Sequence, residues 1–195
     1  MQRKFRDGIV LLAAIGILGV SIKSCVVEAF KVPSNSMSET IEAGDYLLIN
    51  KFIYGARTPS SIFFIPLPSI QFPAVTSLQR GDIVALVAPT DPFHTVKLIK
   101  RCIGISGDTI KIQEGRLTVN NEEFPLRYYF EEKNFGPVVV PPDSFFVMGD
   151  NVNISSDSRE WGCVPMKNLI GKAALIYWSK GERGIRWNRI GRMVK

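Results

Sequence analysis

Hydrophobic residues are distributed in two different ways along this chain of 195 residues. Near the N-terminus, residues 8–22 contain no charged side chain and follow a short basic segment. Such a run is typical of a membrane-spanning helix, provided that it continues toward residue 29 to match a bilayer core of about 30 Å. The basic residues before the run predict that the N-terminus stays in the cytoplasm. We therefore predict a cytoplasmic segment at 1–7 and a transmembrane anchor at 8–29.

A cleaved secretory signal peptide is an alternative explanation of the same run. Gly19-Val20-Ser21 is an acceptable small-x-small cleavage site. Against this alternative, apolar residues continue past that site through Cys25-Val26-Val27. A buried helix of a soluble protein explains the run less well, because no polar face interrupts residues 9–20. The sequence favours an uncleaved anchor.

Beyond residue 30 the pattern changes to short apolar runs separated by Gly, Pro, Asn and Asp. Short runs bounded by such residues are typical of β-strands, and no later segment has a long helical period. We predict a mostly β domain over residues 30–195, barrel-like or made of two packed sheets, outside the cytoplasm. The predicted strands are 46–49, 83–87, 96–103, 110–112, 117–119, 138–140, 145–148 and 173–178, with a hairpin turn at 113–116.

Two segments do not fit this pattern. Residues 60–72 are very apolar, but Pro66 and Pro68 exclude a helix or a central strand. This segment is either a loop folded onto the core or an apolar loop that enters the membrane surface. Basic residues recur at about every third position from Lys180 to Lys195. They form either a solvated face or a surface attracted to anionic lipid.

The charge balance narrows the classes of partner. A formal net charge of +6 and a pI near 9.3 suit nucleic acid or an anionic membrane surface. No zinc-finger spacing and no recognition helix supports nucleic acid. The three cysteines, Cys25, Cys102 and Cys163, are an odd number, and the sequence leaves open whether Cys102 and Cys163 form a disulfide.

Candidate chemistry begins just after the apolar run, at Ser34 and Ser36. In an extended segment, two residues separated by one position point to the same side. One hydroxyl can attack while the other donates a hydrogen bond to the developing oxyanion. A serine nucleophile needs a base, and the single histidine, His94, lies in a predicted turn. A Ser-His-Asp triad is therefore disfavoured. An ordinary polar turn without catalytic function also explains Ser34 and Ser36.

Lys100 is the candidate base. Strand periodicity places Lys100 on one face with Leu98 and Cys102, whereas Lys97 lies on the opposite face. A lysine among apolar neighbours loses hydration, which lowers its pKa and permits a neutral amine. The alternative is an edge-strand lysine in solvent. No zinc-ligand spacing, Walker motif or dinucleotide-binding glycine pattern occurs, so we expect neither metal nor cofactor.

A polar loop at 148–162 contains side chains that can organise such a site. Asp157 and Arg159 can form an ion pair, and either Ser155 or Ser156 can hold a neutral amine through a hydrogen bond. Without other information, an ordinary structured loop explains the same residues.

Taken together, five segments in this order behind an apolar run resemble the bacterial type I signal peptidases, the membrane-bound leader peptidases of the Ser-Lys class. The resemblance covers about residues 28–178. The segments are FKVPSNSM (30–37), DYLLINKFIYG (45–55), RGDIV (80–84), KRCIGISGD (100–108), and GDN (149–151) with Ser155, Asp157-Ser158-Arg159 and Trp161-Gly162.

The resemblance implies a role for each candidate residue and an all-β catalytic domain. Ser36 would be the nucleophile and Lys100 the general base. Ser34 and the Ser36 backbone N–H would form the oxyanion hole, and Ser155 would orient the Lys100 amine. Asp150, Asp157 and Arg159 would hold the loop, and the substrate pockets for small side chains would be lined by Phe30, Val32, Pro33, Leu98 and Ile99.

The implied function is a monomeric membrane endopeptidase that removes signal peptides from exported preproteins at the bacterial cytoplasmic membrane. Three departures from the family pattern bear on substrate preference: Glu39 and Ser106 replace prolines, and Val152 and Ile154 replace charged residues. A dedicated processing peptidase of the same class is therefore a second hypothesis. A membrane-anchored β domain that only binds preproteins or lipid is a third.

Overall fold

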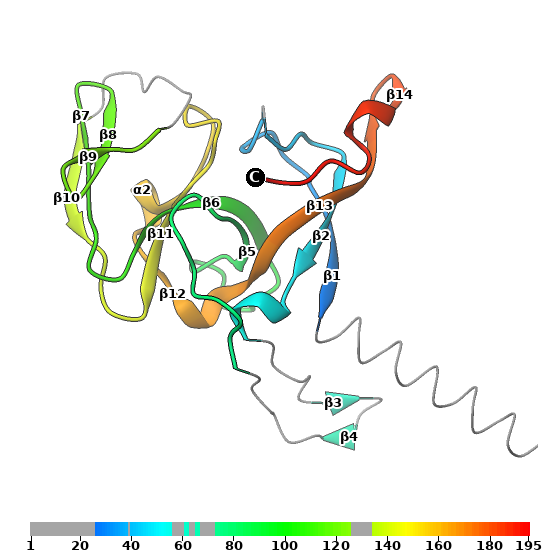
Figure 1. Cartoon of the computed structure of the whole chain (residues 1–195), viewed down its shortest axis with the longest axis horizontal. Coiled ribbons are helices and arrows are strands. Elements are labelled where there is room, and N and C mark those ends of the chain that lie inside the picture. The colour runs from blue at the N-terminus through cyan, green and yellow to red at the C-terminus, as the bar shows by residue number, and fades with distance from the viewer. Residues whose placement is uncertain (1–25, 39, 56–60, 63–64, 67–72, 126–133) are drawn as a thin grey trace, which may run out of the picture.

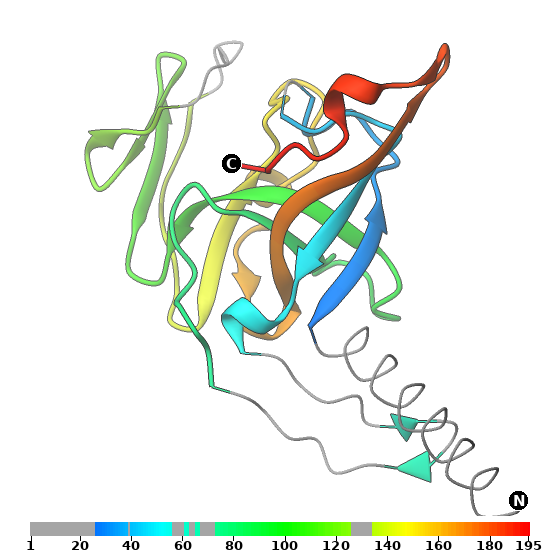
Figure 2. The ribbon, with the colours of Figure 1, turned by 45° about the vertical axis from the view of Figure 1, so that its right-hand side comes forward.

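The computed structural model describes residues 26–38, 40–55, 61–62, 65–66, 73–125 and 134–195. Its main feature is an eight-stranded antiparallel sheet that curls into a half-barrel (Figures 1 and 2). The strand order is β1-β2-β13-β5-β6-β11-β12, and β14 pairs with β13. The bounds are β1 Val27–Lys31, β2 Asp45–Asn50, β5 Ile83–Val87, β6 Lys97–Ile105, β11 Ser144–Met148, β12 Val164–Pro165, β13 Leu169–Gly181 and β14 Gly184–Ile185.

A second sheet of four strands lies beside the half-barrel (Figure 1). The predicted hairpin joins β7 to β8 through Glu114 and Gly115, with φ values of 51° and 73°. Two successive positive φ angles match a type I′ turn, whose twist suits a hairpin. The prediction of a mostly β fold with two sheets is confirmed. The order is β10-β7-β8-β9, with β7 Thr109–Gln113, β8 Arg116–Val119, β9 Glu122–Glu123 and β10 Phe135–Val139.

A separate two-stranded ribbon pairs β3 (Ser61–Ile62) with β4 (Ile65–Pro66), and the helices that the structure describes are all short. This ribbon is the described part of the proline-containing segment 60–72; the rest of that segment, including its predicted contact with membrane, lies outside the described residues. The helices are η1 Phe52–Tyr54, α2 Ser158–Trp161, η2 Met166–Asn168 and η3 Trp187–Arg189.

β1 was not among the predicted strands. It begins at Val27 and pairs with β2, so an anchor helix would have to end before Val27 rather than at residue 29. The rest of the predicted anchor, with the cytoplasmic segment, lies outside the described residues. Within the part of the chain that the structure describes, no helix is long and apolar enough to cross a membrane.

β6 occupies the centre of the domain and contributes to each of three hydrophobic core clusters. Ile99 packs in the first cluster, Ile103 in the second and Cys102 in the third. Cys102 is fully buried and unpaired, and Cys163 is also a free thiol. Because residues 99–100 and 102–104 of β6 are buried, a polar side chain in this part of the strand has a rigid position and little contact with water.

The basic C-terminal segment is only partly exposed, so neither a solvated face nor a lipid-binding surface accounts for all of its basic residues. Arg189 is only 5% exposed and donates hydrogen bonds to the fully buried Asp45 at 2.6–3.2 Å. Arg186 contacts the same carboxylate and also pairs with Glu42. Burial tends to raise the pKa of Asp45, but hydrogen bonds from Arg189 and Ser179 lower it overall. These arginines fasten the C-terminal segment to the chain that follows Ser36.

Candidate active site

Ser36 lies in a turn that follows β1 and is fixed on both sides by the core. Val32 is 3% exposed and Met37 is 1% exposed, and both pack in the first cluster. The backbone N–H of Ile41 donates to the Met37 carbonyl at 2.8 Å, which closes the turn. An apolar residue on each side thus anchors the segment and leaves Ser36 half-buried.

Ser34 is exposed, and its hydroxyl donates a hydrogen bond of 3.4 Å to the Ser36 hydroxyl. The two side chains therefore point to the same side, as the spacing of one residue predicts. Each can face a carbonyl group placed beside the turn.

Lys100 is 3% exposed and lies on β6 opposite Val84 of β5. Its amine donates a hydrogen bond of 2.7 Å to the Ser155 hydroxyl. Desolvation by burial lowers the pKa of Lys100, and the nearby Asp157 carboxylate opposes that effect only in part. The solvent-exposed alternative for Lys100 is wrong, and of the two serines that the sequence left open, Ser155 is the amine's partner.

The loop after β11 holds Ser155 through an internal ion pair. Asp157 is fully buried, caps α2 and pairs with the Arg159 guanidinium at 2.8 Å. Arg159 also donates to the carbonyls of Val152 and Ser155, at 2.7 and 3.2 Å. The predicted Asp157–Arg159 pair is thus present, and it fixes the backbone of the residue that contacts Lys100.

Gly149 connects this loop to the Ser36 segment. A Cβ atom added at Gly149 would lie 2.6 Å from the Ser155 Cβ and would also collide with the Ser36 carbonyl oxygen. The backbone N–H of Asn151 donates to that same carbonyl at 3.0 Å. The absence of a side chain at Gly149 therefore allows Ser36 and Ser155 to approach. The sequence contains this glycine in a family motif, but spacing alone did not reveal its contacts.

Asp150 is held by the residue that follows Lys100. The Arg101 guanidinium donates two hydrogen bonds of 2.7 Å to the Asp150 carboxylate, which is 2% exposed. Thr40 donates a third, at 2.6 Å. Asp150 lies in the predicted polar loop. Its contacts with Arg101 and Thr40 were not predicted, because these residues are 49 and 110 positions away from it in the sequence.

A small cavity of about 30 Å³ opens beside Ser36, between β1 and β6. Its small volume suits a small side chain better than a large one. The five residues predicted to contact the substrate all line this cavity: Phe30, Val32, Pro33, Leu98 and Ile99. The other lining residues are Ser34, Ser36, Met37 and Lys97.

His94 lies apart from these groups. It is exposed in a turn with a φ of 54°, and its backbone N–H donates to the Asp91 carbonyl. Ser36, Lys100 and Ser155 thus provide a half-buried hydroxyl, a buried amine and a hydroxyl that contacts this amine.

Comparison with known proteins identifies the family. The sequence profile of the signal peptidases, peptidase S26, matches residues 5–178. The chain belongs to the signal peptidase family. It is 33% identical over 186 residues to a signal peptidase I of Leptolyngbya laminosa, covering 91% of this chain and 82% of the relative. For a signal peptidase I of Pseudomonas aeruginosa, the identity is 31% over 199 residues, covering 81% and 67%.

A crystal structure of a signal peptidase I from Enterococcus faecalis shares 26% identity with the chain, with a TM-score of 0.43. The match covers 50% of this chain and 97% of the other. As a signal peptidase, the chain acts on signal peptides.

Of the residues that depart from the usual family pattern, Val152 is 4% exposed and packs in the second core cluster, whereas Ile154 is 62% exposed and nothing in the structure explains it.

Proposed function

We propose that this signal peptidase is a serine endopeptidase with Ser36 as nucleophile and Lys100 as general base. The observation that carries this assignment is the buried Lys100 amine, whose hydrogen-bond partner is the neutral Ser155 hydroxyl. Burial favours the neutral amine, which can accept a proton. The cavity beside Ser36, lined by the predicted substrate contacts, supports the same assignment.

In the proposed reaction, Lys100 takes the Ser36 hydroxyl proton as the Ser36 oxygen attacks the carbonyl carbon of the substrate. The oxyanion accepts hydrogen bonds from the Ser36 backbone N–H and the Ser34 hydroxyl. The protonated Lys100 then donates its proton to the departing amine, which leaves an ester on Ser36. Lys100 next removes a proton from water, whose oxygen attacks the ester, and the returned proton restores Ser36.

The substrates proposed are preproteins with small residues at the first and third positions before the cut bond. The small cavity beside Ser36 supports this choice. We also propose the membrane arrangement that the sequence predicts: a cytoplasmic N-terminus, one anchor ending before β1, and a catalytic domain outside the bacterial cytoplasmic membrane. We also propose that the protein acts as a monomer.

Cleavage of a preprotein in detergent or lipid tests the assignment of Ser36 and Lys100. Wild type is compared with Ser36→Ala and Lys100→Met, and with Lys111→Met on β7 as a lysine control in the second sheet. We expect no cleavage by the first two variants and normal cleavage by the third, with all variants folded by circular dichroism. Cleavage by either Ser36→Ala or Lys100→Met at the wild-type rate would contradict the proposal.

A further inference from the structure

The half-barrel has an open seam between β1 and β6. Among the described strands, β1 pairs only with β2, and residues 97–100 of β6 pair only with β5 because β11 begins to pair at Arg101. The small cavity lies between these two free edges. Unpaired edges on both sides suit an extended peptide, which can add as a strand.

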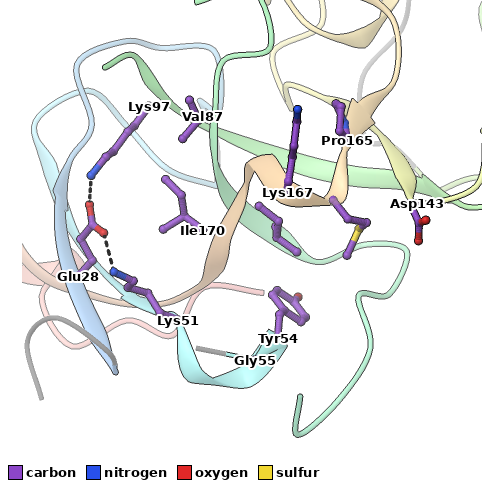
Figure 3. Close-up of a pocket in the computed structure, with 12 residues that line it drawn as sticks. Glu28, Lys51, Tyr54, Gly55, Val87, Lys97, Asp143, Pro165, Lys167 and Ile170 are labelled. Atoms are coloured by element: carbon purple, nitrogen blue, oxygen red, sulfur yellow. Dashed lines mark hydrogen bonds and ion pairs between the residues drawn. The ribbon is translucent and has the colours of Figure 1, made fainter. Parts of the chain in front are cut away.

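An ion pair crosses this seam at its far end from Ser36. The Lys97 amine on β6 donates to one carboxylate oxygen of Glu28 on β1, and Lys51 lies 3.5 Å from the other oxygen (Figure 3). We call these three residues the seam cluster. It contains two lysines and one glutamate, so its net charge is +1. Its side chains are 23–38% exposed, which leaves them accessible to a ligand.

The seam cluster separates two spaces. Lys97 lines the small cavity beside Ser36, and all three residues of the cluster line a larger cavity of about 650 Å³ at the mouth of the half-barrel. Figure 3 shows Glu28 between the two lysines, and Ile170 and Tyr54 also line the larger cavity. A peptide that leaves the small cavity along β1 therefore reaches the seam cluster next.

Strand geometry gives the register of that peptide. Side chains two residues apart share one face of a strand, about 6.8 Å apart. Glu28 and Phe30 of β1 therefore form one row with Val32, which lies just beyond the strand. If the first and third residues before the cut bond occupy the level of Val32 and Phe30, the fifth residue lies at the level of Glu28. The lining of the seam thus changes from apolar to charged within one peptide segment.

We propose that the seam cluster is a charge-selective binding site for the fifth substrate residue before the cut bond, favouring an acidic side chain over a basic one. The inference rests on the proposed function, since it assumes cleavage at Ser36. An acidic side chain can be shared by Lys97 and Lys51, whereas a basic one meets a carboxylate that both lysines already contact. Partly exposed ion pairs of this kind are weak, so we expect kcat/KM to be roughly two- to fivefold higher for a substrate with aspartate at the fifth position than for one with lysine.

The test uses three peptides with alanine at the first and third positions and aspartate, asparagine or lysine at the fifth. We expect wild type to cut the aspartate peptide roughly two- to fivefold faster than the lysine peptide, and this ratio to fall in high salt. Glu28→Gln raises the cluster charge to +2 and should increase the ratio. Lys97→Glu lowers the charge to −1 and should reverse the preference. Lys111→Glu on β7 makes the same charge change away from the seam and should leave the ratio unchanged.

Equal cutting of the three peptides by wild type would overturn the charge-selective site while leaving the proposed function intact. A ratio that changes equally in Lys97→Glu and Lys111→Glu would also overturn it, because a general effect of protein charge would then explain the result. If wild type cuts none of the three peptides, the proposed function fails, and this inference fails with it.

Discussion

Arg101 and Asp150 form a two-point ion pair that joins β6 to the loop after β11, with both hydrogen bonds at 2.7 Å. Arg101 immediately follows the proposed base Lys100, and Asp150 immediately follows Gly149, against which Ser36 and Ser155 pack. The pair therefore joins the two halves of the candidate site next to Lys100 on one side and next to Gly149 on the other. A planar guanidinium suits this paired geometry better than an ammonium does.

Replacing Arg101 with alanine should affect both stability and catalysis. The Asp150 carboxylate, 2% exposed, would lose its charge partner, and removal of one member of such a buried pair costs about 3 kcal/mol of unfolding free energy. Arg80→Ala is the control, since Arg80 forms a similar two-point pair with Asp108 away from Ser36. Urea unfolding should show losses in both variants, but kcat should fall only in Arg101→Ala. Equal kcat values for the two variants would refute this role of Arg101.

Removal of the Ser155 hydroxyl should slow the chemical step. Without it, the Lys100 amine loses the group that fixes its direction, so Ser155→Ala should lower kcat by about 10²-fold at a nearly constant KM. Ser156→Ala is the matched control, because Ser156 is exposed and donates instead to Glu160. Steady-state kinetics on one peptide decides the matter: a comparable drop in the Ser156 variant would show that loop disturbance, rather than loss of the amine's partner, is responsible.

A methyl group at position 149 should separate Ser36 from Ser155. The added atom in Gly149→Ala would overlap the Ser36 carbonyl and the Ser155 side chain, so we expect loss of most activity. The control is Gly181→Ala, in which the new Cβ would lie 3.4 Å from the Arg186 Cδ, an ordinary contact distance. Initial rates per folded molecule measure the difference, and normal activity in Gly149→Ala would mean that the two serines need not approach.

The pH dependence of cleavage should follow the deprotonation of Lys100. Because burial lowers the pKa of Lys100 from its ordinary value near 10.5, activity should rise with pH and level off well below pH 10.5. The kcat/KM profile of the wild type measures this rise. A rate that increases only above pH 10.5 would indicate that the base is a hydrated lysine.

Stability gives a second, independent measure of the same burial. A lysine whose pKa is lower in the folded state binds fewer protons folded than unfolded, so it destabilises the fold below the unfolded pKa. Lys100→Met removes this cost and should raise the melting temperature at pH 7, with a gain that shrinks as the pH approaches 10.5. A lower melting temperature of Lys100→Met at pH 7 would contradict the assigned burial.

The sequence predicted the strands with regular patterns, but it did not predict the contacts that join the candidate site residues. β5, with its apolar run, was predicted at its observed bounds, Ile83–Val87. β1 was missed because apolar residues from the preceding run continue into it, so no change of composition marks Val27. Ser36 and Lys100 lie in segments that resemble family motifs. Spacing cannot pair Arg101 with Asp150, because such a pairing depends on how distant strands align.

The basic C-terminal segment shows the same limit of sequence reasoning. A basic residue at about every third position looks like a solvated surface, and Arg183 and Lys195 are indeed exposed. Arg189 is buried instead, because Asp45 lies in the core and needs a compensating charge. Nothing near Arg189 in the sequence reveals that partner, which is 144 residues away.

The contacts of Arg189 with Asp45 and with the Thr40 carbonyl also set an order of events during biosynthesis. The turn that carries Ser36 is made early, but the side chain that braces the following segment is added about 150 residues later. Until residue 189 has been synthesised, Asp45 lacks its main counter-charge. β2, which carries Asp45, also lacks its pairing with β13 until that late strand has been made. A growing chain therefore cannot complete the surroundings of Ser36 early, so we expect the protein to become active only near the end of its own synthesis.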